Sequence, residues 1–196
     1  MQCEKGGFLM NKVEKAIIFA TKAHAGTCRK GKDKPYILHP LEAMMIVMQN
    51  TDDEDILAAA VLHDTVEDTS VTIKRIENEF GPRVAELVAS VTEDKKRKLP
   101  PEATWRARKW ESIFSLKNAS RETKLICLGD KLSNLRELDE DYANLGDAVW
   151  ERFNQKDKEM HAWYYRELLK ILEETFTYEF YQETEEFSNL IDNIFG

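Results

Sequence analysis

The sequence predicts an all-α protein, a helical bundle that forms one domain, and three observations support this prediction. Apolar residues recur at intervals of three and four along most of the chain, which is the period of an amphipathic helix. No segment alternates apolar and polar residues convincingly, as a half-buried strand would. Proline, acidic or hydroxyl residues stand near the start of several helical segments, as expected at helix N-termini. A length of 196 residues fits a domain of ordinary size.

Five helices are expected in the first half of the chain. They span residues 11–25, 39–50, 52–64, 70–81 and 82–94. Pro40 and Pro82 occupy the first turn of two of them, where the missing amide proton costs nothing. Acidic residues fill the first turn of the helix at 52–64, where the helix dipole favours negative charge.

The second half continues the helical pattern, with two predicted loops. The expected helices span residues 104–117, 120–138 and 156–176, and the expected loops span 95–103 and 139–155. The first loop, "KKRKLPPEA", is rich in lysine and punctuated by proline. We assign residues 1–176 to the domain, and residues 177–196 to an acidic, aromatic tail or one more helix on the core.

The composition argues against a general nucleic-acid-binding protein. The net charge is −8 at pH 7, whereas such proteins are usually basic. Two basic stretches interrupt this acidic background, "CRKGKDK" at 28–34 and "DKKRK" at 94–98. They are either solvated loops or binding sites for a small phosphorylated ligand, and the sequence leaves both interpretations open.

Cysteine usage and hydropathy predict a cytoplasmic protein with no membrane partner. Cys3, Cys28 and Cys127 are far apart and form no CxxC pair, so neither a disulfide framework nor a cysteine metal site is indicated. The N-terminus does not have the pattern of a secretory signal. The longest apolar run, "ILAAAVL", is far shorter than the roughly 20 residues that cross a bilayer.

The most informative stretch is "LAAAVLHDTVEDTSVT", which crowds ionisable groups at the end of the most apolar segment. His63, Asp64, Glu67 and Asp68 lie within six positions. If the helix continues through Asp68, these residues form two pairs at a spacing of four on one face. Three neighbouring carboxylates repel one another, and a bound cation relieves the repulsion. Imidazole and carboxylate together suit Mn, Fe or Zn.

Two other positions could complete such a cation site. His39 stands at the junction of a loop and a helix, and Asp130 lies inside the apolar segment "LICLGDKLSNL" with Asn134 one turn later. A buried carboxylate is costly unless it is paired or bound to a cation. The simpler interpretation is that His39 caps a helix and that Asp130 pairs with Lys131 or Arg136.

Taken together, these motifs resemble those of a known family. The strings "AHAGTCRKGKDKPYILHP", "AAAVLHDTVEDTSVT", "FGPRVAELVASVTEDKK" and "KLICLGDKLSNLREL" are similar to the HD superfamily of metal-dependent phosphohydrolases. The match is specifically to the hydrolase domain of RelA/SpoT proteins and to the small alarmone hydrolases. The combination of HDxxED with RKx8H and DKLxN is specific, and it covers roughly residues 11–138 in the expected order.

The resemblance implies a fold, a metal site and a catalytic pair. The fold would be the helical bundle of the HD domain. One Mn²⁺ would be bound by four residues, His39, His63, Asp64 and Asp130. Glu67 and Asp68 match the acidic pair that positions and activates the attacking water in the family.

The resemblance also implies substrate contacts. Arg29 and Lys30 match a basic pair near the guanine and the phosphates, and Asn134 matches a residue that holds the ribose. The lysine-rich loop supplies a phosphate contact in single-domain members, for which Lys95 and Lys98 are the candidates. The implied partner is a small guanosine nucleotide.

The implied activity is hydrolysis of guanosine 3′,5′-bis(diphosphate), (p)ppGpp, to GDP or GTP and pyrophosphate. Two alternatives stay open. The first is a nucleotidase or NADPH phosphatase with the same metal site, and the second is a non-catalytic nucleotide-binding module.

The chain also departs from the family pattern at two positions. Gly129 replaces a common alanine, which is expected to weaken the helix by about 1 kcal/mol at most, and Ser133 replaces a bulkier residue of the pocket wall.

Overall fold

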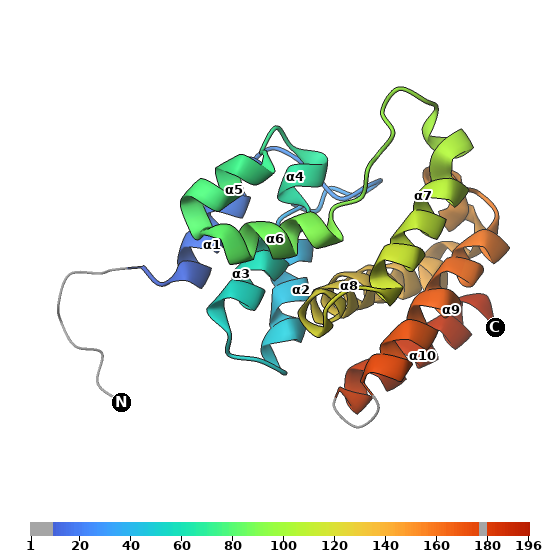
Figure 1. The fold of residues 1–196 in the computed structure, drawn as a ribbon. Helices are drawn as coiled ribbons and strands as arrows, with labels where there is room; N and C mark the ends of the chain where they lie inside the picture. The colour runs from blue at the N-terminus through green and yellow to red at the C-terminus, as the bar shows by residue number, and fades with distance from the viewer. Residues whose placement is uncertain (1–9, 177–179) are drawn as a thin grey trace.

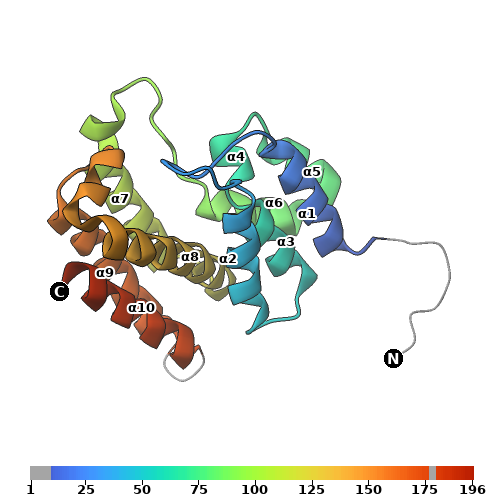
Figure 2. The ribbon, with the colours of Figure 1, turned by 180° about the vertical axis from the view of Figure 1, so that it is seen from behind.

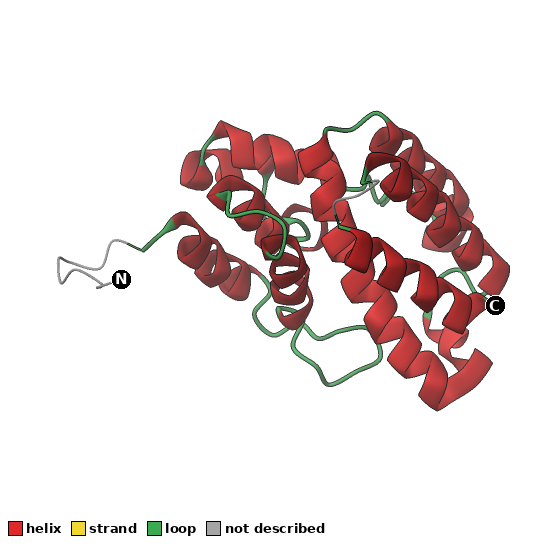
Figure 3. Cartoon of the chain, turned by 90° about the horizontal axis from the view of Figure 1, so that it is seen from below, coloured by secondary structure: helices red, strands yellow, loops and turns green. Residues whose placement is uncertain are grey.

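The computed structural model describes residues 10–176 and 180–196, and their regular secondary structure is entirely helical (Figure 3). A single isolated bridge joins Cys28 to Pro35. The prediction of an all-α fold is therefore confirmed. Cys3 lies outside the described residues. The helices form two groups with the long helix α8 between them (Figures 1 and 2).

The first group of helices surrounds α3. It consists of α1 (Lys12–Ala23), α2 (Leu38–Met48), α3 (Glu54–Leu62), α4 (Thr65–Asp68), α5 (Ile73–Phe80) and α6 (Pro82–Val91). Every side chain of α3 from Ile56 to Leu62 is buried, because α1, α2 and α6 all pack against it. The helix begins at Asp53, whose carboxylate accepts hydrogen bonds from the amides of Asp55 and Ile56. The "HD" dipeptide, His63 and Asp64, follows directly after this buried helix.

The second group completes the bundle. It consists of α7 (Pro101–Lys117), α8 (Arg121–Leu145), the 3₁₀ helix η1 (Gly146–Arg152), α9 (Lys158–Thr175) and α10 (Tyr181–Phe195). Helix α8 packs against α2 and α10, and α7 packs against α9. Helix α8 therefore contacts both groups.

The predicted loop at 139–155 is wrong. Helix α8 continues to Leu145 and is followed directly by η1. The acidic sequence of this segment is typical of a solvated loop, but Asp141 is buried and forms ion pairs with Lys32 and Arg152. Partners that are distant in the sequence thus stabilise helix where the local composition favours a loop.

The C-terminal segment contributes to the core. Phe187 and Ile194 of α10 are fully buried against the rest of the bundle, and Arg136 of α8 forms a two-pronged ion pair with Glu186. The first three residues of the predicted tail, 177–179, lie outside the described residues. The division of the chain after residue 176 stays a prediction.

Membrane insertion finds no support in the helices. Within residues 10–176 and 180–196, none combines the length and the apolar composition that a bilayer span requires.

Helices α2 and α8 lie in close contact at Gly129. A β-carbon added at this position would lie 2.6 Å from the carbonyl oxygen of Ala43 and 2.8 Å from a methyl group of Val47. The glycine therefore allows a close helix crossing, which the sequence alone did not indicate. Asp130, the next residue, is held at this crossing.

We predict that Gly129→Ala destabilises the protein. The substitution gains about 1 kcal/mol of helix propensity, but overpacking of a tight contact costs about 1–3 kcal/mol. Chemical denaturation is expected to show a net loss of stability, and Gly129→Ser is expected to lose more. A stabilised alanine variant would mean that the two helices separate without cost.

Candidate active site

The "HD" dipeptide lies in a turn rather than inside a helix. Helix α3 ends at Leu62 and α4 begins at Thr65, close to the predicted helix end at residue 64, so the helix does not continue unbroken through Asp68. The hydroxyl of Thr65 donates to the carbonyl of Leu62 and helps to end α3. Asp68 nevertheless lies one turn after Asp64, because its amide donates to the Asp64 carbonyl at 2.9 Å. The turn directs both His63 and Asp64 towards the same cavity.

Three segments bring two histidines and two aspartates together. His39 lies on α2, His63 and Asp64 lie in the turn after α3, and Asp130 lies on α8. The Nε2 atom of His39 is 3.2 Å from Oδ1 of Asp130, and the Nε2 atom of His63 is 3.1 Å from Oδ2 of Asp64. The cross distances are 3.5 Å for His39–Asp64 and 3.6 Å for His63–Asp130. Four potential ligand atoms thus face one another.

Hydrogen bonds on the far side of each ring fix the protonation of both histidines. Nδ1 of His63 donates to the carbonyl oxygen of Ala60 at 2.8 Å. Nδ1 of His39 lies 2.9 Å from the hydroxyl of Ser133, which itself donates to Glu42. Ser133 therefore orients His39, a role that the sequence did not reveal. With Nδ1 holding a proton in each ring, both Nε2 atoms face carboxylate oxygens and are available to a metal ion, as in ligating histidines.

This arrangement suits a divalent cation. The Nε2 atom of His63 is buried and has no hydrogen-bond partner. Atoms of His39, His63 and Asp130 lie within 4.8 Å of one another, and nitrogen with carboxylate oxygen is a donor set for transition metals. Lone pairs that face carboxylates repel them unless a proton or a metal ion lies between.

The local electrostatics indicate the same need for positive charge. Burial disfavours a charged His63, yet the carboxylates of Asp64 and Asp130 hold the pKa of this ring well above its ordinary value. Burial would also raise the pKa of Asp130, but the positive charges of Lys131 and His63 hold it well below the usual range. The carboxylates thus stay ionised in a buried site.

Asp130 also makes the pairing that the simpler interpretation anticipated. Its Oδ2 atom is 2.6 Å from the ammonium of Lys131, and its Oδ1 atom accepts a hydrogen bond from Asn134 at 2.6 Å. Arg136 is engaged elsewhere, with Glu42 and Glu186. The ion pair with Lys131 occupies one carboxylate oxygen, and the other still faces the histidines.

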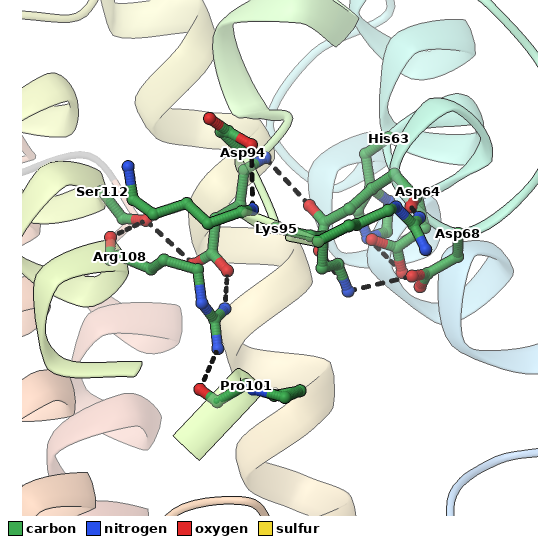
Figure 4. Close-up of polar contacts among 12 residues, drawn as sticks. His63, Asp64, Asp68, Asp94, Lys95, Pro101, Arg108 and Ser112 are labelled. Carbon is green, nitrogen blue, oxygen red and sulfur yellow. Dashed lines mark hydrogen bonds and ion pairs between the residues drawn. The ribbon is translucent and has the colours of Figure 1, made fainter. Parts of the chain in front are cut away.

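Glu67 and Asp68 extend the site along α4. The ammonium of Lys95 bridges them, at 2.8 Å from Oε1 of Glu67 and 2.9 Å from Oδ1 of Asp68 (Figure 4). The amide of Glu93 donates to the other oxygen of Glu67 at 3.0 Å. Burial and the neighbouring Asp64 raise the pKa of Glu67. The loop after α6 therefore closes over the acidic pair.

Tyr36 is a member of the site that sequence reasoning missed. Its hydroxyl lies 2.6 Å from Oδ2 of Asp64 and 2.9 Å from Oδ2 of Asp68, so it links the two acids. The ring stacks on the buried ring of His24 at 4.7 Å. The only signal in the sequence is that Tyr36 precedes His39 by three residues.

One large cavity unites most of the predicted residues. Its volume is about 1000 Å³, and its walls include the histidine–aspartate cluster, the acidic pair, Arg29, Lys95 and Asn134. A second cavity of about 240 Å³ is lined by Arg29, Lys30, Asn134 and Phe153, among others. Lys98 is exposed and lines neither cavity. The structure therefore brings Lys95 but not Lys98 to the site.

Arg29 and Asn134 are connected directly. A guanidinium nitrogen of Arg29 donates to the amide oxygen of Asn134 at 2.7 Å, and another donates to Glu137 at 2.7 Å. The guanidinium also lies over the ring of Tyr36, 5.5 Å from its centroid. These contacts hold two predicted substrate residues side by side, where the two cavities share a wall.

A basic wall on α7 also escaped the sequence analysis. Glu93 accepts hydrogen bonds from Arg108, from Lys109 at 2.9 Å and from Ser112 at 3.2 Å (Figure 4). Burial would raise the pKa of Glu93, but Lys109 and Arg108 lower it to about 2. Arg108 also bonds to Thr104. The string "RARK" has no feature that separates this wall from an ordinary solvated helix face.

Known proteins with similar sequences act on guanosine nucleotides, according to their names. The chain is 36% identical over 141 residues to guanosine-3′,5′-bis(diphosphate) 3′-pyrophosphohydrolase MESH1 of Danio rerio, covering 70% of this chain and 73% of that protein. Identity to the Xenopus tropicalis protein of the same name is 41% over 126 residues, or 63% and 67% of the two chains. A GTP pyrophosphokinase rsh of Brucella ovis is 33% identical over 126 residues, covering 64% of this chain and only 17% of the longer protein.

Solved structures show the same fold. A structure described as a metazoan orthologue of SpoT that hydrolyses ppGpp matches with a TM-score of 0.74 and 26% identity, over 95% of this chain and 97% of the other. A protein of Listeria monocytogenes EGD-e matches with a TM-score of 0.67 and 30% identity, over 80% of this chain and 98% of the other.

The family model agrees with these relatives. The model described as HD domain matches residues 16–157, which include the histidine–aspartate cluster and the acidic pair beside it. The predicted resemblance is therefore confirmed, and this chain belongs to the HD domain family.

Proposed function

We propose that this chain is a metal-dependent phosphohydrolase that hydrolyses (p)ppGpp, giving GDP from guanosine 3′,5′-bis(diphosphate) or GTP from its 5′-triphosphate form, together with pyrophosphate. One observation carries the proposal. The histidine–aspartate cluster, the acidic pair and the Arg29–Asn134 pair line a single cavity. The names of the MESH1 relatives, at 36% and 41% identity, support this substrate over other nucleotides.

The cluster would hold one divalent cation, for which we propose Mn²⁺. The ligands would be the Nε2 atoms of His39 and His63 and the facing oxygens of Asp64 and Asp130. A bound divalent ion lowers the pKa of water from about 15.7 towards neutrality and polarises a phosphoryl oxygen.

Glu67 and Asp68 would position the attacking water and accept its proton. Glu67 suits proton transfer, because burial and Asp64 shift its pKa upward from the ordinary carboxyl value. Lys95 forms ion pairs with both carboxylates. We propose that a substrate phosphate attracts this ammonium away from them and thereby frees the pair.

Arg29 and Asn134 would hold the nucleoside. Their mutual hydrogen bond places a guanidinium and an amide at the border of the two cavities. Lys30 and Phe153 of the smaller cavity supply a cation and an aromatic face, with the ammonium 5.8 Å from the ring centroid. A purine base would fit such a combination of polar and aromatic contacts.

The reaction is a displacement at phosphorus. The water oxygen bonds to the phosphorus next to the ribose, and the bond from that phosphorus to the 3′ oxygen breaks. Its electron pair stays on the 3′ oxygen, which takes up a proton. The water proton passes to the acidic pair, and the released pyrophosphate carries the water oxygen.

We predict that the metal-stripped protein, resupplied with Mn²⁺, releases pyrophosphate and GDP from ppGpp. Asp64→Ala should abolish this release. NADPH is offered in parallel, and the products are separated by ion-exchange chromatography. Orthophosphate from NADPH with ppGpp intact would favour the phosphatase alternative. Binding of ppGpp without turnover of either compound would favour a non-catalytic module.

We predict that Glu67→Gln and Asp68→Asn lower kcat by about 10²–10⁴, the usual contribution of proton transfer to a positioned base. Binding of Mn²⁺ is expected to persist in both variants. Glu77→Gln serves as the control, because Glu77 is half-exposed on α5 and its side chain forms an ion pair only with Lys74 among the described contacts. Full activity of the Glu67 and Asp68 variants would assign proton transfer elsewhere.

We predict that Mn²⁺ raises the melting temperature of the metal-stripped protein. An ion at about 100 times its Kd adds about 2.7 kcal/mol of stability, which corresponds to roughly 5–10 °C for a chain of this size. Asp130→Asn should lose this shift, whereas Glu140→Gln on the exposed face of the same helix should keep it. An equal shift in Asp130→Asn would place the ion at another site.

A further inference from the structure

Two lysines form a positively charged wall that the proposed mechanism has not used. Lys109 on α7 and Lys131 on α8 both line the large cavity, and their side chains are 19% and 22% exposed. Neither lines the smaller cavity. The lysine pair therefore lies on a different flank of the cavity from Lys30 and the shared Arg29–Asn134 border.

The acids nearest to these lysines are already shared. Glu93 accepts from Lys109, but it also accepts from Arg108 and Ser112. Each nitrogen of the Arg108 guanidinium donates one hydrogen bond, to Thr104, Glu93 and the carbonyl of Pro101. One carboxylate thus faces two cations, and the ammonium of Lys109 keeps unused donor capacity.

Asp130 is shared in the same way once a metal is bound. One of its oxygens faces His39 and His63, and the other pairs with Lys131 at 2.6 Å. A single negative charge cannot neutralise both a divalent ion and an ammonium. The ammonium groups of Lys109 and Lys131 are mostly buried and have too few acidic partners. Binding of a further anion beside them is therefore favourable.

The charges of the two lysines also act on each other. Burial lowers the pKa of Lys109, and the positive charge of Lys131 lowers it further. The ammonium of Lys109 lies 4.9 Å from the ring centroid of Tyr164, which provides some stabilisation but no negative charge. An anion between the two lysines would relieve their repulsion.

We propose that Lys109 and Lys131, with the hydroxyl of Ser112, bind the pyrophosphate group that is cut from the nucleotide. This assignment rests on the proposed function, because it places the nucleoside at Arg29 and Asn134. The pyrophosphate, on the other side of the bond to the 3′ oxygen, would then extend towards Lys109 and Lys131. A diphosphate carries several negative charges and suits two point charges and a hydroxyl donor.

The test is equilibrium dialysis of labelled inorganic pyrophosphate against the protein at a fixed free Mn²⁺ concentration. Lys109→Met keeps the apolar stem and removes the charge, and Lys109→Arg restores a cation. Lys117→Met is the matched control, since Lys117 is exposed at the end of the same helix. GDP binding is measured on the same samples, and circular dichroism checks the fold.

We expect Lys109→Met to weaken pyrophosphate binding by about tenfold or more, as for the loss of a charged hydrogen bond. Lys109→Arg should recover part of the affinity, and Lys117→Met should match the original protein. GDP binding should change little. If Lys109→Met fails to fold, Lys131→Met is measured instead, with Mn²⁺ binding determined alongside.

Equal pyrophosphate affinity in Lys109→Met and the original protein would overturn the inference, whatever the hydrolytic activity. An equal loss of GDP and pyrophosphate binding would also overturn it, because the effect would then be general. Lys109-dependent pyrophosphate binding without ppGpp hydrolysis would support the anion site and count against the proposed reaction alone.

Discussion

The site depends on one electrostatic constraint, which is that two imidazole lone pairs face two buried carboxylates. Ala60 and Ser133 fix the proton of each ring on Nδ1, so both Nε2 atoms point at oxygen. Such an arrangement is unfavourable in a low-dielectric interior unless a positive charge lies at its centre. The positions of these ring nitrogens and carboxylate oxygens therefore call for a positive charge between them, and further charged side chains surround the cluster.

The scaffold meets this constraint by bringing three helix ends and one helix crossing together. Helix α3 is buried on all sides and ends in the "HD" turn, while α2 carries His39 from its first turn. Helix α8 supplies Asp130 next to Gly129, where the absence of a side chain allows close contact with α2. Packing of the apolar core therefore also positions the polar site. The residues that make the helix contacts are next in the sequence to the proposed metal ligands.

Positive charge is distributed on three sides of the cluster. Lys95 pairs with the acidic pair, Arg29 lies at the border of the smaller cavity, and Lys109 and Lys131 line the larger cavity. Each cation is held by an acid of the protein until a more highly charged anion competes for it. An acidic protein can therefore present a cationic interior to a small phosphorylated ligand while its net charge repels large polyanions.

The sequence by itself determined the helical class and most helix positions, and it singled out the residues proposed as metal ligands. Helical periodicity is a local property, and an acid within an apolar helix, such as Asp130, is conspicuous without any structure. Tertiary structure alone decided the length of α8, the contacts of Tyr36 and Ser133, and the position of Lys109 in the cavity wall. Their function arises from contacts between segments up to about a hundred residues apart, and no local pattern records which distant side chains a fold will bring together.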